Sequence, residues 1–572
     1  MTATERYQIW CEKATEDVDL VTELQKIAGN ESEITERFSN DLVFGTGGLR
    51  GVIGAGTSLM NIYTVRRATQ GLADYILQQK PQGASVAIAY DSRIKSELFS
   101  KEAAAVMAGN GIHAYIYPEL MPTPMLSFAV RALNAQGGIN VTASHNPSKY
   151  NGYKVYGADG CQLTDDAAGA VFRCIEKVDL FDGVKRVDFE QGVKENLISF
   201  IGDEVQQRYL DAVQSQAVHT DVCKKAGLKV IYTPLNGAGN KPVRAIMKRI
   251  GVEHVAVVPE QEKLDGTFPT CPYPNPEIRQ VFECGLKMAK EDEPDLLLAT
   301  DPDSDRVGIA ARDGDDYRLF TGNEVGAMLL NYILSQRSAQ GTLPQKPVTV
   351  KTIVTTPIIY SIAKKYGCEV VDVLTGFKYI GEKIGELEKA GEESRYVLGF
   401  EESYGYLSGS YVRDKDAVFA AMMICEMAAF YKLQGKSLVD VIQDIYREFG
   451  YYINSVSNFE CSGLAGMQKM QEIMDSLRAA APAEIGGVAV ESIADYYRSE
   501  KTVCATGEKE KIYLPKSNVL SFMLAGGANA VVRPSGTEPK IKVYVAASGK
   551  TKENAEMLSK SLLAAITKLM GF

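Results

Sequence analysis

A serine on a predicted loop is the first group in this sequence that could do chemistry. The apolar run Gly137 to Val141 is followed by Thr142-Ala143-Ser144-His145-Asn146-Pro147. Because a proline disfavours helical geometry at the residue before it, Ser144 is expected on an irregular loop after a strand. A serine oxygen is a weak nucleophile unless a neighbouring group activates it. On its own S-H-N-P is an ordinary turn, so the hypothesis of a reactive hydroxyl depends on the other loops.

A cluster of carboxylates follows another predicted strand. Asp301, Asp303 and Asp305 come directly after a short apolar run, which places them at the carboxyl end of a strand, where ligands gather in open α/β sheets. Three oxygen donors at alternate positions can face one point and suit Mg²⁺. The alternative is an acidic surface turn. A calcium EF-hand is excluded, because Arg306 stands where that loop requires glycine.

Two more loops offer groups that would hold a phosphorylated sugar. Glu401 to Tyr404 follows a predicted strand and offers acceptors for paired sugar hydroxyls, although adjacent acidic residues are usually solvated. Arg533 to Thr537 combines a guanidinium, two hydroxyls and the amides of a glycine turn, which suits a phosphate dianion. The alternative there is an ordinary hairpin turn. Together with Ser144 and the carboxylates, these loops predict phosphoryl transfer.

Three weaker signals accompany these loops. Phe44 to Gly51 has glycines that allow close backbone approach to a ligand, and its Arg50 offers a fork suited to phosphate. Thr375 to Lys378 ends a predicted strand in a small loop with one cation. Lys415, in Arg-Asp-Lys-Asp, is most simply interpreted as one member of an exposed charge cluster.

Other functional classes find little support. The 572 residues carry a formal charge of -10, which argues against general binding to nucleic acid or anionic membranes. The sequence has no G-x-S-x-G, no H-E-x-x-H and no complete P-loop, and its four histidines make a histidine-rich metal site improbable. The N-terminal residues lack the form of a signal peptide, and the ten scattered cysteines fit reduced thiols in a cytoplasmic protein.

The elements that must position these loops follow an α/β pattern. The length alone suggests about three to five domains. A strand, loop and helix recur from residues 84–90, 229–232 and 348–354, which predicts three related α/β domains. The last quarter predicts an α+β domain, with strands at 519–524, 530–532 and 541–545 and a helix at 552–568. Amphipathic helices are expected within residues 3–39, a long helix over 197–213, and a buried helix over 417–431.

Taken in order, F-G-T-G-G-L-R-G, T-A-S-H-N-P, D-P-D-S-D-R, T-G-F-K, E-E-S and R-P-S-G-T-E-P resemble the motifs of the α-D-phosphohexomutases. The match covers nearly the whole chain. The sugar loop E-E-S-Y-G is most similar to that of the phosphoglucomutase and phosphopentomutase branch, and differs from the G-E-M-S-G-H form of bifunctional phosphomannomutases.

The resemblance implies four domains around a central cleft, three of them mixed-sheet α/β and the last TATA-box-protein-like. The expected domains are 1–208 with the serine loop, 209–321 with the metal loop, 322–447 with the sugar loop and 448–572 with the phosphate loop. It also implies Mg²⁺, glucose 1,6-bisphosphate as activator and intermediate, sugar phosphates as ligands, and a monomer or homodimer.

The resemblance further implies a role for individual residues. Ser144 would carry a phosphate, Lys154 and Lys415 would take part in proton transfer, and His145 would support the serine loop. The full implied assignment is catalysis by Ser144, His145, Arg50, Lys154, Lys415 and Arg306, metal binding by Ser144, Asp301, Asp303 and Asp305, and substrate binding by Thr375, Gly376, Lys378, Glu401, Ser403, Arg533, Ser535, Gly536 and Thr537.

The leading hypothesis is a mutase that interconverts glucose 1-phosphate and glucose 6-phosphate. The enzymatic alternatives are a phosphopentomutase, a hexose-bisphosphate synthase or a phosphomannomutase. A non-catalytic sugar-phosphate sensor would keep the anion-binding loops but tolerate the loss of Ser144 or of an aspartate. Because Ser144 and all three aspartates are present, the sequence favours an enzyme.

Overall fold

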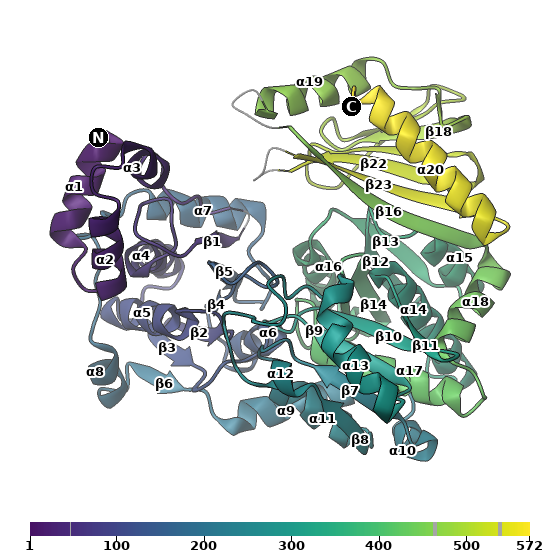
Figure 1. Ribbon diagram of the computed structural model, residues 1–572, viewed down its shortest axis with the longest axis horizontal. Helices are drawn as coiled ribbons and strands as arrows, with labels where there is room; N and C mark the ends of the chain where they lie inside the picture. The colour runs from purple at the N-terminus through teal and green to yellow at the C-terminus, as the bar shows by residue number, and fades with distance from the viewer. Residues whose placement is uncertain (46, 462–465, 536–539) are drawn as a thin grey trace. The chain divides into compact units, whose positions relative to one another are not determined.

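The computed structural model describes residues 1–45, 47–461, 466–535 and 540–572 (Figure 1). These residues form two compact units: Met1–Gly322 with Phe377–Leu438, and Asn323–Gly376 with Val439–Phe572. Gly536 and Thr537 of the predicted phosphate loop lie outside the described residues. Within the described ranges, no helix combines the length and the apolar character needed to cross a membrane.

The first unit begins with three short helices and a six-stranded mixed sheet. The helices are α1 (Ala3–Lys13), α2 (Val18–Lys26) and α3 (Glu31–Phe38). The strands are β1 (Gly48–Val52), β2 (Ser85–Tyr90), β3 (His113–Ile116), β4 (Gly137–Val141), β5 (Tyr150–Gly157) and β6 (Ile198–Phe200). Their order is β1-β5-β4-β2-β3-β6, with β2 parallel to β3 and β4, and β5 antiparallel to β1 and β4.

Helices pack on this sheet and complete the first α/β domain. They are α4 (Ile62–Gln79), α5 (Ser96–Gly109), α6 (Thr123–Ala132), α7 (Asp165–Ile175) and α8 (Phe189–Lys194). Asn61 begins α4 with a capping box, because its side chain accepts from the amides of Tyr63 and Thr64 while the Thr64 hydroxyl accepts from Asn61 N. Every residue of β4 is buried, as expected of a central strand covered on both faces.

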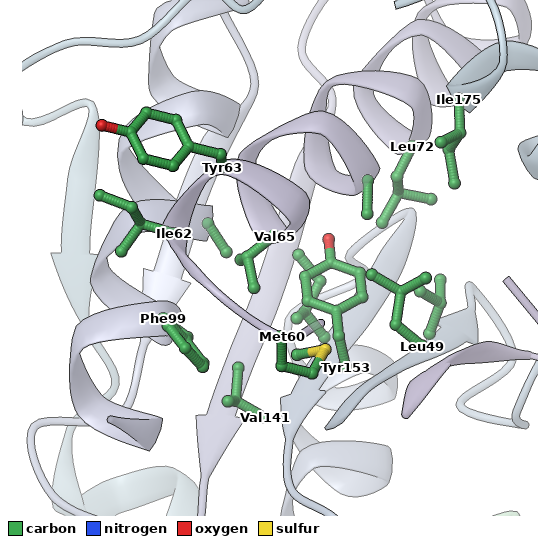
Figure 2. Close-up of a cluster of buried hydrophobic side chains, with 14 of the residues drawn as sticks. Leu49, Met60, Ile62, Tyr63, Val65, Leu72, Phe99, Val141, Tyr153 and Ile175 are labelled. Atoms are coloured by element: carbon green, nitrogen blue, oxygen red, sulfur yellow. The ribbon is translucent and has the colours of Figure 1, made fainter. Parts of the chain in front are cut away.

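The core of this domain fixes the strands that flank the serine loop (Figure 2). Val65 and Leu72 of α4 belong to the same buried cluster as Leu49 of β1, Val141 of β4 and Tyr153 of β5. Burial of each such side chain contributes on the order of 1.5–3 kcal/mol, so β4 and β5 are held firmly against α4. The loop between these two strands carries Ser144.

A second mixed sheet in the first unit carries the carboxylate loop. Its strands are β7 (Lys229–Thr233), β8 (His254–Val257), β9 (Leu296–Thr300), β10 (Val307–Asp313) and β11 (Asp316–Leu319), in the order β11-β10-β9-β7-β8. Strand β7 pairs in parallel with β8 and β9. The accompanying helices are α9 (Asp203–Gln214), α10 (Val222–Ala226), α11 (Asn240–Arg249), α12 (Pro259–Glu262), η1 (Arg279–Phe282) and α13 (Glu283–Asp292).

The remainder of the first unit comprises a helix, an antiparallel strand pair and a buried helix. These are α16 (Phe377–Lys389), η2 (Glu393–Arg395), β14 (Tyr396–Glu401), β15 (Gly405–Leu407) and α17 (Ala417–Lys432). Asp416 begins α17 by accepting from the amides of Val418 and Phe419. The expected buried helix at 417–431 is therefore confirmed.

The second unit contains a parallel strand pair with helices and a large antiparallel sheet. The first part is α14 (Gly322–Ala339), β12 (Val348–Thr352), α15 (Ile358–Lys365), β13 (Glu369–Val373) and α18 (Leu438–Phe449). The sheet strands are β16 (Tyr451–Glu460), β17 (Glu484–Ile485), β18 (Val488–Asp495), β19 (Glu500–Val503), β20 (Lys509–Lys511), β21 (Leu520–Leu524), β22 (Asn529–Pro534) and β23 (Lys540–Gly549). Helices α19 (Gly466–Ala479) and α20 (Lys552–Leu569) and the short η3 (Ala525–Gly527) complete it.

The last sheet has the order β16-β23-β22-β21-β18-β19-β20, and α20 lies across β16 and β23 (Figure 1). The predicted strands of the last quarter and the closing helix are thus confirmed. One expected element is wrong. The long helix predicted over 197–213 is strand β6 followed by α9, because the chain extends alongside β3 at Ile198–Phe200 and the backbone is still extended at Gly202, just before the helix begins.

Candidate active site

The serine loop leaves the carboxyl end of β4 and places Ser144 in an unusual backbone conformation. Ser144 has φ +51°, in the left-handed region that residues other than glycine seldom adopt. Its amide donates to Thr142 Oγ1 at 2.8 Å, and its side chain is buried. The loop turns back at once, since Asn146 N donates to Ala143 O at 3.1 Å. The expectation of an irregular loop after a strand is confirmed.

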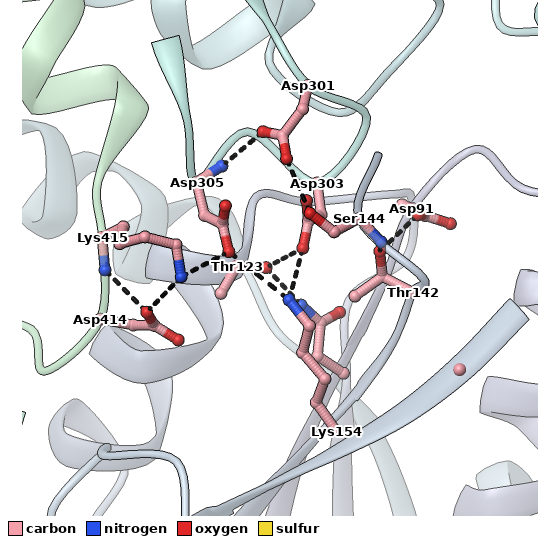
Figure 3. Close-up of polar contacts among 12 residues, drawn as sticks. Asp91, Thr123, Thr142, Ser144, Lys154, Asp301, Asp303, Asp305, Asp414 and Lys415 are labelled. Carbon is pink, nitrogen blue, oxygen red and sulfur yellow. Dashed lines mark hydrogen bonds and ion pairs between the residues drawn. The ribbon is translucent and has the colours of Figure 1, made fainter. Parts of the chain in front are cut away.

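The carboxylate loop follows β9 and meets the serine loop directly (Figure 3). Ser144 Oγ donates to Asp301 Oδ2 at 2.8 Å, although the two residues are 157 positions apart in the sequence. Asp301 Oδ1 accepts from the amides of Asp305 and Arg306 at 3.1 and 3.0 Å. The hydroxyl of the first predicted loop and the acids of the second therefore lie at one point in the first unit.

The three aspartates are arranged as a metal-binding group. Asp301, Asp303 and Asp305 are at most 1% exposed, and one oxygen from each lies within 4.8 Å of the others. Asp303 Oδ1 and Asp305 Oδ1 are buried but receive no hydrogen bond from the described residues. Buried carboxylate oxygens normally have a partner, and hard oxygen donors in this arrangement fit a divalent cation. The aspartate cluster can hold a metal ion.

Two helices direct their N-terminal ends at this loop. The first amide of α6, Thr123 N, donates to Asp303 O at 2.9 Å, and the first amide of α17, Ala417 N, donates to Ser304 O at 3.3 Å. The positive ends of helix dipoles favour nearby negative charge. Both helices therefore help to keep a dense group of carboxylates in a buried place.

Asp301 and Asp303 differ in how strongly nearby positive charges stabilise their ionised forms. Burial, together with the charges of Asp303 and Asp305, raises the pKa of Asp301 well above its ordinary value. Burial acts in the same direction on Asp303, but the ammonium groups of Lys154 and Lys415 outweigh it and lower the pKa of Asp303. A bound divalent cation would favour the ionised form of all three acids.

Two lysines complete the charge cluster. Lys154 Nζ, on β5, lies 2.8 Å from Asp303 Oδ2 and 3.5 Å from Asp305 Oδ2. Lys415 Nζ lies 3.1 Å from Asp305 Oδ2 and 3.0 Å from Asp414 Oδ1. Burial opposes the charge of each lysine, yet the neighbouring carboxylates raise the pKa of both. The simple interpretation of Lys415 as part of an exposed cluster is wrong, because its side chain is only 12% exposed and faces the acids.

The remaining residues assigned to catalysis surround the same point. His145 Nδ1 lies 3.2 Å from Ser144 Oγ, and burial, with the charges of Arg306 and Arg50, lowers the pKa of His145 well below its ordinary value. Arg306 Nη1 pairs with Glu277 Oε1 at 2.8 Å. Arg50 is exposed on β1 and donates to Asn146 Oδ1 of the serine loop at 3.4 Å. Burial and the charges of the two arginines therefore both disfavour the protonated imidazole.

The first unit also holds part of the predicted sugar-binding set. Glu401 ends β14 and is buried, which raises its pKa, and the charges of Lys415 and Arg306 act against that rise. Ser403 is half-buried in the turn that follows. Lys378, in α16, is buried and pairs with Asp165 at 2.6 Å.

The other predicted substrate residues belong to the second unit. Thr375 and Gly376 follow β13, and Thr375 Oγ1 is buried without a hydrogen bond from the described residues. Arg533 is half-buried in β22, and Ser535 N donates to Lys540 O at 2.8 Å. Gly536 and Thr537, which are also predicted to bind substrate, lie outside the described ranges.

No sequence motif marks several of the residues that contact the site. Asp414 accepts from Tyr156 OH at 2.7 Å while it pairs with Lys415. Thr123 Oγ1 donates to Asp303 Oδ2 at 2.9 Å and accepts from Asn140 Nδ2 at 2.7 Å. A helix-starting threonine and a strand asparagine are common, so only their three-dimensional position distinguishes them.

The Thr123 contact leads to a prediction about metal affinity. Thr123→Val should weaken the binding of a divalent cation such as Mg²⁺ to the aspartate cluster about tenfold, because Asp303 loses the donor that orients it. It should also lower the melting temperature, since buried Asn140 loses its acceptor. Calorimetric titration with Mg²⁺ measures the affinity. Thr123→Ser keeps the hydroxyl and should bind as the wild type does. Equal affinity in the valine and serine variants would contradict the orienting role.

Comparison with known proteins agrees with this geometry. Four family models match in order: phosphoglucomutase/phosphomannomutase α/β/α domain I at residues 41–181, domain II at 207–314, domain III at 321–449 and the C-terminal domain at 469–561. A phosphoglucomutase from Staphylococcus saprophyticus is 37% identical over 515 residues, which cover 90% of this chain and 92% of the relative. One from Staphylococcus aureus is 36% identical over 549 residues, covering 95% of this chain and 96% of the relative.

A solved structure shares the fold. The exocytosis-sensitive phosphoprotein parafusin, a phosphoglucomutase from Paramecium, superposes with a TM-score of 0.69 at 17% identity, covering 92% of this chain and 94% of that one. The expected architecture of three α/β domains and a distinct C-terminal domain is therefore confirmed. By its four domains and its relatives, the chain belongs to the phosphoglucomutase/phosphomannomutase family of α-D-phosphohexomutase enzymes.

Proposed function

We propose that this enzyme interconverts glucose 1-phosphate and glucose 6-phosphate through a phosphorylated Ser144 and a glucose 1,6-bisphosphate intermediate. Curated relatives at 36 and 37% identity over most of the chain are named phosphoglucomutase, which supports this substrate. The observation that carries the proposal is the buried contact of 2.8 Å between Ser144 Oγ and Asp301, inside a cluster that can hold a cation.

The metal ion we propose is Mg²⁺. Asp301, Asp303 and Asp305, with an oxygen of the phosphorylated Ser144, would hold it, and it would neutralise negative charge on the group being transferred. The two orphaned carboxylate oxygens of Asp303 and Asp305 support this ligand set.

The proposed transfer exchanges one oxygen–phosphorus bond for another. A free hydroxyl of the bound sugar phosphate attacks the phosphorus on Ser144, so the sugar O–P bond forms as the Ser144 Oγ–P bond breaks. The hydroxyl loses one proton and the released serine oxygen gains one. The bisphosphate then turns and returns its other phosphate to Ser144, which restores the starting enzyme. Because this chemistry is mainly positioning and charge neutralisation, Arg50 and Arg306 would assist it electrostatically.

Lys154 and Lys415 are the groups proposed to move that proton. Each has its Nζ within 3.1 Å of a carboxylate of the aspartate cluster, and the raised pKa values favour the ammonium form. The ammonium form carries a proton for the departing serine oxygen, although the raised pKa makes each lysine a weaker acid than a free one. His145, whose Nδ1 lies 3.2 Å from that oxygen, would support the loop.

Substrate recognition is proposed from the matching motifs. Glu401 and Ser403 would bind the sugar hydroxyls, with Thr375, Gly376 and Lys378 as a second contact, while Arg533, Ser535, Gly536 and Thr537 would bind the distal phosphate.

The domain limits 1–208, 209–321, 322–447 and 448–572 remain our proposal. A cytoplasmic location is also proposed, because the ten cysteines, all within the described residues, are free thiols.

A comparison of substrates tests the function. Glucose, mannose and ribose 1-phosphates are supplied separately with Mg²⁺ and glucose 1,6-bisphosphate, and the 6-phosphate or 5-phosphate products are measured. We expect the highest kcat/KM with glucose 1-phosphate. A preference for ribose 1-phosphate would instead identify a phosphopentomutase, and binding without turnover of all three would identify a sensor.

A further inference from the structure

A buried ion pair at the end of β2 contacts the backbone of the serine loop, and neither of its two residues has been assigned to catalysis, substrate or metal. Asp91 and Arg93 are 2% and 3% exposed, and Arg93 Nε lies 3.3 Å from Asp91 Oδ2. The guanidinium also lies over the ring of Phe268, 5.0 Å from its centre. A buried charge pair is costly unless its remaining donors and acceptors are satisfied. The stability of this buried ion pair therefore depends on which groups accept from the other Arg93 donors and which groups donate to Asp91.

The donors of Arg93 go to the backbone of the serine loop. Nη2 donates to the carbonyl oxygens of Ser144 and Asn146. Nη1 donates to the carbonyl oxygens of Pro147 at 3.0 Å and Tyr150 at 3.1 Å. One rigid, planar cation thus binds three carbonyls of the loop after β4 and the carbonyl of Tyr150, the first residue of β5.

The acceptors of Asp91 reach the other side of Ser144 (Figure 3). Asp91 Oδ2 accepts from Thr142 Oγ1 at 2.6 Å, and Thr142 Oγ1 accepts from Ser144 N at 2.8 Å. Asp91 Oδ1 is anchored by Ser96 Oγ at 2.8 Å. The N–H of Ser144 is therefore held by Asp91 through Thr142, and the carbonyl of Ser144 is held directly by Arg93.

The conformation that is held is one that serine would not keep unaided. A φ of +51° is disfavoured for a residue with a Cβ and persists only where the surroundings determine it. This conformation points Ser144 Oγ at Asp301, at 2.8 Å. If Ser144 relaxed to an ordinary conformation, its side chain would point elsewhere while the carboxylates stayed in place.

We propose that Asp91, Arg93 and Thr142 form a loop clamp, a set of positioning residues that holds Ser144 in its left-handed conformation so that its oxygen is presented to the aspartate cluster. This inference rests on the proposed role of Ser144 in phosphoryl transfer. The clamp contacts Ser144 through its backbone and not through its side-chain oxygen. It can therefore hold the loop whether or not that oxygen carries a phosphate.

Thr142→Val is the sharpest test, because valine has the same shape and removes only the hydroxyl that joins Asp91 to Ser144 N. We expect kcat to fall about ten- to a hundredfold, since a misplacement of about 1 Å at a reacting group has effects of this size. KM for glucose 1-phosphate should stay within about twofold. Hydrogen–deuterium exchange in peptides spanning residues 140–148 should become at least about tenfold faster.

Two matched variants distinguish positioning from general stability. Thr142→Ser keeps the hydroxyl and should restore both kcat and slow exchange. Thr69 is equally buried in the same domain and donates to Tyr153 OH at 3.0 Å, away from the loop. Thr69→Val should lower the melting temperature and leave kcat and the exchange of residues 140–148 unchanged.

The results separate the clamp from the proposed function. A Thr142→Val enzyme with wild-type kcat and wild-type exchange in residues 140–148 would overturn the clamp. Equal losses of kcat in Thr142→Val and Thr69→Val would also overturn it. A wild-type protein without turnover and without phosphate on Ser144 would refute the proposed function, and the exchange measurement would still decide whether the clamp holds the loop.

Discussion

Replacing Ser144 with alanine is expected to lower kcat by at least about a thousandfold, the order of loss found when a covalent nucleophile is removed. The change deletes the oxygen that donates to Asp301 and that we propose to carry the phosphate. Steady-state turnover of glucose 1-phosphate measures the loss. The fold should persist, because Thr142 and Arg93 contact only the backbone of residue 144.

Intact mass gives an independent measure of the same proposal. Wild-type protein incubated with glucose 1,6-bisphosphate should contain a species heavier by one phosphate, and Ser144→Ala should not. Ser148→Ala is a matched control, because Ser148 lies half-buried four residues further along the same loop. It should keep both the phosphate and the turnover. An Ser144→Ala enzyme with full turnover, or loss of the phosphate only in Ser148→Ala, would remove the proposed mechanism.

Asp301→Asn is expected to abolish the response to Mg²⁺ and to lower kcat by at least about a hundredfold, because a metal ion supplies several kcal/mol of charge stabilisation in such transfers. The asparagine oxygen can still accept from the amides of Asp305 and Arg306, and its amide can donate to Ser144 Oγ. The loop geometry should therefore survive the loss of the ligand charge.

Although Asp301→Asn should lower kcat, it should not lower the melting temperature of the metal-free protein. Asp301 makes no ion pair with the described residues, whereas Asp303 and Asp305 pair with Lys154 and Lys415. Removing its charge relieves repulsion within the cluster, so the melting temperature of the metal-free protein should stay equal or rise. Mg²⁺ should raise the melting temperature of the wild type, and this increase is expected to be absent in Asp301→Asn.

Thermal unfolding and calorimetric titration, each with Mg²⁺ and with a chelator, measure both effects. Asp313→Asn is the matched control, because Asp313 is exposed at the end of β10 in the same sheet. It should bind Mg²⁺ and turn over as the wild type does. Wild-type Mg²⁺ affinity in Asp301→Asn would remove the proposed metal site.

The loops that bear the chemistry were predictable because their positions follow from local rules. Apolar runs that end in polar residues predict strand ends, and strand ends in α/β sheets gather ligands. Ser144 after β4 and Asp301 after β9 are where this reasoning places them. The expected helix over 197–213 failed for a non-local reason, because pairing with β3 extends residues 198–200 into β6.

Lys415 and Arg93 show the limit of local reasoning. A lysine between two aspartates has the composition of a solvated surface cluster, and its burial depends on Asp305, 110 residues earlier in the chain, which lies 3.1 Å from its Nζ. Arg93 follows a strand end that the sequence marks plainly. Its four carbonyl partners, from Ser144 to Tyr150, belong to the loop after β4 and to the first residue of β5, more than 50 residues further along the chain.

The sequence by itself determined the donors: a hydroxyl, three carboxylates, the cations and the loops that carry them, because residue type and strand-end spacing are properties of short segments. The tertiary structure decided which of these charged groups lie close enough to shift one another's pKa. It also decided that the serine oxygen points at Asp301. Burial, ion pairing and a strained backbone angle each depend on contacts between segments far apart in the chain, and short-range patterns do not encode those contacts.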